Sequence, residues 1–158
     1  MVDEQPDNDM RLLAIAYLEF FAKNDKASMR LLERDRRLIV RSVGAFGWFL
    51  MDAVVIPTKH GVGWADGWVE VDFRSRTDPA FAATLLRRNA YRRLARGRVV
   101  CTRHNLRKAT CEVAAMLCMA YAAEAGLAQS VSAREAMLHT LHELRSRFGH
   151  ASDANKSA

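Results

Sequence analysis

Apolar residues recur at helical spacing along much of the chain, and this pattern predicts a mostly α-helical fold. Between about Asp9 and Lys23 the apolar positions repeat every three or four residues, and Asn24 can close this helix in a left-handed conformation. A second helix is expected from about Lys26. Its apolar face would contain Leu31, Leu32, Leu38, Ile39, Val43 and Phe46.

Three more helices are predicted towards the C-terminus. The first would start at Asp78 as N-cap and run to about Arg96. The second, from about Leu106 to Ala125, is apolar almost all round, which is typical of a central core helix. The third opens with Ser132 and Glu135 in capping-box spacing and would end at Gly149.

Residues 53–76 differ from the rest, because they are rich in β-branched, aromatic and glycine residues. Val69, Val71 and Phe73 alternate with polar residues, which is the period of a half-buried strand. Glycines at 61, 63 and 67 supply turns towards residues 54–58, and residues 98–102 would form a third strand or a loop. The predicted fold is therefore mostly α (α+β), with about five helices and a central β-hairpin or small antiparallel sheet.

The composition fits one small domain. With 158 residues, half of them hydrophobic, the chain is expected to form a single globular domain over residues 1–150 with a disordered C-terminal tail at 151–158. Three cysteines without CxxC spacing indicate reduced thiols and a cytoplasmic location. The acidic first ten residues lack the features of a signal peptide, and charges interrupt both long apolar stretches, so a membrane span is not expected.

The net charge of +6 is unevenly distributed along the chain. Residues 1–25 carry two bases against six acids, a net −4, whereas residues 26–50 carry six bases against two acids, a net +4. Residues 76–100 carry seven bases against one acid, a net +6. The basic character is therefore concentrated in two segments.

The first basic segment is an arginine stripe at helical spacing, formed by Arg30, Arg34, Arg37 and Arg41. The second lies within residues 87–108 and contains no acid. Its cations are Arg87, Arg88, Arg92, Arg93, Arg96, Arg98, Arg103, Arg107 and Lys108. Like charges four residues apart destabilise a helix by a few tenths of a kcal/mol, roughly, so their repetition indicates a partner for the charge.

Nucleic acid is the favoured partner, because the planar guanidinium group suits phosphate and 19 of the 24 basic residues are arginine. No motif with base-reading side chains is present, so contact with the backbone is expected without sequence-specific readout. Three alternatives stay open: an acidic protein partner, pairing with acidic segments of the same chain, and a merely solvated face.

The tryptophans add a second hypothesis. Trp64 and Trp68 flank a predicted turn and are candidate interface aromatics, and together with Trp48 they could instead stack on bases or pack in the core. An acidic protein partner would then meet the arginines, with the tryptophan hairpin as apolar anchor. The chain would in that case be an adaptor, inhibitor or assembly subunit, and a homodimer is compatible with either hypothesis.

No pattern indicates catalysis, a metal or a cofactor. Cys101 and His104 are three residues apart without an oxyanion loop, and His139 and His142 lack further metal ligands at a known spacing. The sequence therefore predicts a small, basic, non-enzymatic accessory or regulatory protein that contacts nucleic acid through arginines.

Overall fold

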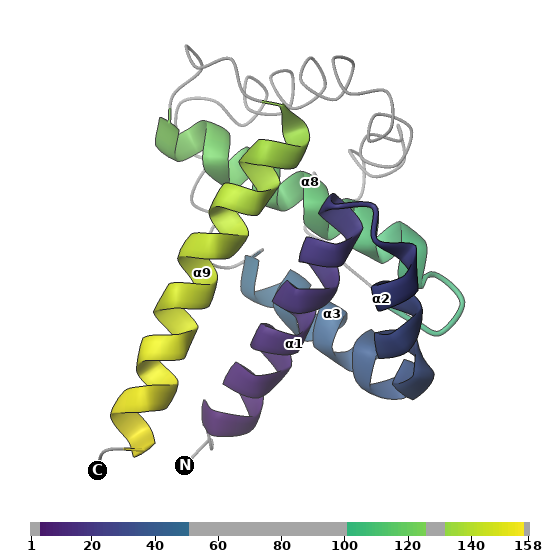
Figure 1. Cartoon of the computed structure of the whole chain (residues 1–158), viewed down its shortest axis with the longest axis horizontal. Coiled ribbons are helices and arrows are strands. Elements are labelled where there is room, and N and C mark those ends of the chain that lie inside the picture. Colours follow the sequence, from purple (N-terminus) through teal and green to yellow (C-terminus); the bar gives the residue numbers. More distant parts are fainter. Residues whose placement is uncertain (1–3, 51–100, 126–131, 157–158) are drawn as a thin grey trace.

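The computed structural model describes residues 4–50, 101–125 and 132–156, and these residues are almost entirely helical (Figure 1). The α-helices are α1 (Glu4–Ala22), α2 (Lys26–Leu32), α3 (Arg36–Leu50), α8 (Leu106–Ala125) and α9 (Ala133–Lys156). A short 3-10 helix, η1 (Glu33–Asp35), joins α2 to α3. No helix in these three ranges is long and apolar enough to cross a membrane.

Helix α1 packs against both α3 and α9, and α8 packs against α3 and α9. In Figure 1, α9 lies on one side of this assembly and α2 on the other, and α8 crosses from the α2 side to the α9 side. The short helix α2 folds back onto α1. The start of α8 is thereby placed close to the segment that carries the first arginine stripe.

The core lies where these long helices meet. Tyr17 and Leu18 of α1, Phe46 of α3 and Leu141 of α9 are buried in it, and residues 113–118 of α8 are without exception inaccessible to solvent. A helix that is apolar all round is stable only when it is covered on every side, which explains the central position of α8. The prediction that α8 is the central core helix is confirmed, including both of its bounds.

The predicted α+β fold class is wrong, because the described residues contain helices and no strand. Cys101 and Thr102, at the end of the possible third strand, are irregular. The segment assigned to the hairpin and the helix expected over residues 78–96 lie outside the described residues. The physical reason for the error is that alternation over five or six residues is a local signal, whereas the long helices cover one another's apolar faces without a sheet.

The helix termini follow the sequence in part. Asn24 closes α1 with a positive φ of 56°, and the Ser132 hydroxyl accepts the Glu135 amide at 3.2 Å, so both of these predictions are confirmed. The predicted end at Gly149 is wrong, because α9 continues to Lys156. A single glycine costs a helix only about 1 kcal/mol, and no proline follows it.

The second predicted helix begins at Lys26 as expected but is interrupted by η1. A 3-10 helix has about 3.0 residues per turn instead of 3.6, so the residues before and after it no longer share one face. Ile39, Val43 and Phe46 are buried as predicted, whereas Leu31 and Leu38 are 56% and 40% exposed. The prediction that these two leucines belong to the buried face is wrong.

Candidate nucleic-acid interface

The first arginine stripe is carried by a helical segment with a well-defined start. Asp25 caps α2, because its Oδ1 accepts the Ser28 amide at 3.1 Å and its Oδ2 accepts the Ser28 hydroxyl at 2.7 Å. These hydrogen bonds lower the pKa of Asp25, so this carboxylate is ionised at neutral pH and engaged with its own helix.

The two acids of η1 are also engaged within the chain. The buried Tyr17 hydroxyl donates a hydrogen bond of 2.7 Å to Glu33 Oε1, which ties η1 to the core. Burial, together with this hydrogen bond, raises the pKa of Tyr17 well above its ordinary value. Asp35 Oδ1 accepts the Leu38 amide at 3.2 Å and so caps the start of α3. Within the described segments, neither Glu33 nor Asp35 forms an ion pair with an arginine.

All four members of the first arginine stripe are exposed, as the sequence predicts. Within residues 4–50, 101–125 and 132–156 no ion pair engages Arg30, Arg34, Arg37 or Arg41. The alternative that this stripe pairs with acids of its own chain therefore finds no contact in the described part of the structure.

Arg36 links the stripe to the start of α8. Its Nε and Nη2 both donate to the Arg103 carbonyl, at 3.2 and 2.7 Å. The turn at residues 102–105 is closed by the Asn105 side chain, whose Oδ1 accepts the Thr102 amide at 2.5 Å, and by the Asn105 amide, which donates to the Thr102 carbonyl at 3.3 Å. Arg103 and His104 of this turn, and Arg107 in the first turn of α8, are exposed to solvent.

The segment before this turn lies against α3. A Cβ atom added at Gly44 would lie 3.4 Å from Cys101 Cβ, which is an ordinary van der Waals distance. Cys101 also packs against the buried core.

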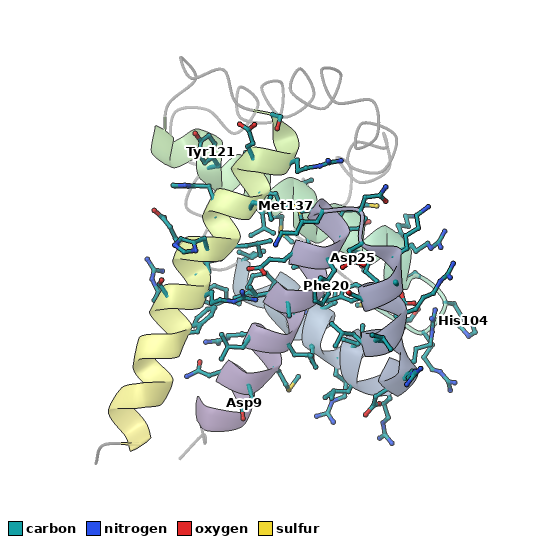
Figure 2. All side chains as sticks on the ribbon, in the orientation of Figure 1. Asp9, Phe20, Asp25, His104, Tyr121 and Met137 are labelled. Carbon is teal, nitrogen blue, oxygen red and sulfur yellow. The ribbon has the colours of Figure 1, made fainter. Side chains whose placement is uncertain are left out.

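The Arg36 hydrogen bonds bring the start of α3 and the described end of the second basic segment together. We call this combination the basic surface; it comprises Arg30, Arg34, Arg36, Arg37, Arg41, Arg103, His104, Arg107 and Lys108. Figure 2 shows nitrogen-tipped side chains projecting around His104 on the side of the molecule opposite α9. Arg36 was not among the predicted site residues, because its role depends on a contact 67 residues away in the sequence. Arg87, Arg88, Arg92, Arg93, Arg96 and Arg98 lie outside the described residues.

Three large apolar side chains are exposed in the described segments, and all lie on α2 or α3. They are Leu31, Leu38 and Trp48, which are 56%, 40% and 57% exposed. The predicted interface aromatics Trp64 and Trp68 lie outside the described residues. The basic surface is therefore interspersed with apolar groups on the helices that carry the first stripe.

Cys101 and His139 have defined surroundings in the structure. Burial, with a smaller contribution from the Glu112 carboxylate, raises the pKa of the Cys101 thiol to about 11, so this thiol is protonated at neutral pH. His139 lies 3.3 Å from Glu143 and packs edge-on against Tyr121. Over the described ranges, no three His, Cys, Asp or Glu side chains are grouped so that they could hold a metal ion.

Comparison of the chain with protein-family models, curated proteins and solved structures found no match. The case for function therefore depends on the basic surface itself.

Proposed function

We propose that this protein is a non-enzymatic accessory or regulatory protein that binds nucleic acid through its phosphate groups. One observation carries the proposal: α2, η1, α3 and the start of α8, which Arg36 links to α3, carry eight arginine and lysine side chains, and the nearby acids Asp25, Glu33 and Asp35 are engaged in local hydrogen bonds. The six arginines within residues 87–98 would add positive charge to the proposed contact, and their contribution is proposed from the sequence alone.

The proposal rests on electrostatics and on the shape of the guanidinium group. Phosphates would offset the repulsion between neighbouring cations, and binding would release counterions from the nucleic acid. Arginine donates in a planar fork that matches phosphate oxygens. Because such contacts do not read base edges, the proposed binding tolerates many sequences.

An acidic protein partner is the second candidate. The exposed Leu31 and Leu38 favour it, because protein interfaces combine arginine with buried apolar groups, whereas phosphate contacts need no leucine. In this case the protein would act as an adaptor, inhibitor or assembly subunit.

A salt titration distinguishes the two. Binding of a fluorescein-labelled duplex and of labelled poly-L-glutamate would be measured by anisotropy, starting at about 50 mM salt. The nucleic-acid proposal expects tighter binding of the duplex or its single strand, with log K falling linearly as log salt rises. Failure to bind either strand form at the lowest salt would overturn it, and tighter binding of polyglutamate would favour the acidic protein.

A further inference from the structure

Trp48 is an unusual residue on α3. Its side chain is 57% exposed, although the next residue, Phe49, packs against the rings of Phe46 and Phe148. No ring contact or hydrogen bond within the described part of the chain engages Trp48. A large aromatic side chain left in water gains free energy from any partner that covers it.

Helix geometry places Trp48 in line with two members of the first arginine stripe. Arg37, Arg41 and Trp48 are separated by four and seven residues, so they fall within a band of about 40° on the surface of α3. At 1.5 Å per residue, this line is about 16 Å long. A nucleic-acid strand following α3 would cover this length with about five nucleotides at a rise of 3.4 Å.

The order of groups along this line fits a strand with unpaired bases. Arg37 and Arg41 can each hold a phosphate, and the indole ring of Trp48 offers a flat face for stacking. In a duplex the faces of the bases are already stacked on one another, so an exposed tryptophan gains little from it. Single strands present base faces directly to aromatic side chains.

We infer that α3 binds single-stranded nucleic acid, with Arg37 and Arg41 on the phosphates and Trp48 stacked on a base. This inference rests on the proposed function and narrows it to one class of nucleic acid. Base stacking is independent of base identity, in agreement with the lack of a base-reading motif.

The test compares a labelled oligo(dT) of about 15 nucleotides with a duplex of the same length, using the full-length protein. Trp48→Leu keeps an apolar side chain but removes the ring, and Trp48→Phe keeps an aromatic ring. The wild-type protein should bind oligo(dT) more tightly than the duplex. Trp48→Leu should bind oligo(dT) about 5- to 100-fold more weakly than wild type, whereas Trp48→Phe should keep most of the affinity for oligo(dT). Duplex binding should be the same for all three proteins.

A second measurement observes Trp48 directly. With Trp64→Phe and Trp68→Phe, Trp48 is the only remaining tryptophan, and oligo(dT) should quench its fluorescence. If the duplex and oligo(dT) bind equally and Trp48→Leu changes neither affinity, the single-strand inference is overturned while the proposed function stands. If neither probe binds at low salt, the proposed function itself fails.

Discussion

Arginines on the two sides of the helical core have different surroundings. On the α1–α9 side, Arg11 lies over the rings of Phe49 and Phe148, at 4.7 and 5.3 Å from their centroids, and Arg145 forms a 3.0 Å ion pair with Glu19. On the α2–α3 side, the first arginine stripe is exposed and no described residue forms an ion pair with it. Arg11 and Arg145 thus have partners within the chain, whereas the first arginine stripe presents four exposed cations close together in the sequence.

This difference shows that the number of arginines alone is a poor measure of binding. Arg11 stabilises the contact between α1, α3 and α9 through its stem and its charge, so its loss should affect stability. The exposed stripe contributes little to stability and should affect binding. Stability and binding can therefore be measured separately for the two sides.

The largest expected effect concerns Cys101, which lies beneath the basic surface. Because the fold raises its pKa from 9.0 to about 11, the thiolate fraction at neutral pH should be about 100-fold lower than for an ordinary thiol. The neutral thiol is the form favoured by the fold, so its contribution to stability is present below pH 9 and is lost as the pH rises towards 11. Alkylation by iodoacetamide, followed by peptide mass mapping, should accelerate with pH throughout the range 7 to 10.

The chain unfolded in urea provides the control. Its cysteines should have ordinary pKa values, so their alkylation rate should level off once the pH exceeds the ordinary thiol pKa. A Cys101 rate that levels off near pH 7 to 8 in the folded protein would mean that the neighbouring arginines activate the thiol. In that case the basic surface would have a chemical role that the proposed function does not include.

Arg11→Ala tests the engaged side. It should lower the free energy of unfolding by about 1–2 kcal/mol, because it removes both the cation–π contacts and the packing of the arginine stem. Arg11→Met keeps the stem and should lose less. Urea denaturation would measure both, and nucleic-acid affinity should stay unchanged. A drop in affinity without a drop in stability would contradict the separation of the two sides.

Tyr17→Phe tests how η1 is held to the core. It should lower the free energy of unfolding by about 1 kcal/mol at pH 7, because the hydrogen bond to Glu33 is lost. The pKa of Tyr17 is raised in the folded state, so wild-type stability from this group is lost as the pH rises above 10. Phenylalanine does not titrate, so the stability of the variant lacks this dependence on pH. The difference in the free energy of unfolding between wild type and variant should therefore decrease by about 1.4 kcal/mol per pH unit above pH 10. A difference that stays constant between pH 7 and 11 would refute the assigned pKa shift.

Local signals in the sequence were sufficient for much of the helical structure. The bounds of α8, the left-handed Asn24 and the capping of α9 by Ser132 depend on neighbouring residues alone, and all three were predicted. The predicted end of α9 was wrong, because a single glycine costs a helix only about 1 kcal/mol and Gly149 does not terminate it.

The candidate site was predictable only in part. The exposure of the first stripe follows from its spacing, whereas periodicity does not indicate the interruption by η1, whose Glu33 accepts a hydrogen bond from Tyr17, sixteen residues earlier. This interruption is also the reason why Leu31 and Leu38, which an unbroken helix would place on the buried face, are exposed. The hydrogen bonds from Arg36 to the Arg103 carbonyl join segments 67 residues apart in the sequence, and no spacing rule indicates them.

The central claim is that the α2–α3 side binds nucleic acid and the α9 side does not. Two double variants test it directly, because Arg37→Gln with Arg41→Gln and Arg145→Gln with Arg147→Gln both lower the net charge from +6 by two. In a plot of log K against log salt for oligo(dT), the first variant should reduce the slope by about 1.4, or 0.7 per phosphate contact, and the second should leave it unchanged. Equal slopes for the two variants would show that only total charge matters, and would contradict the account.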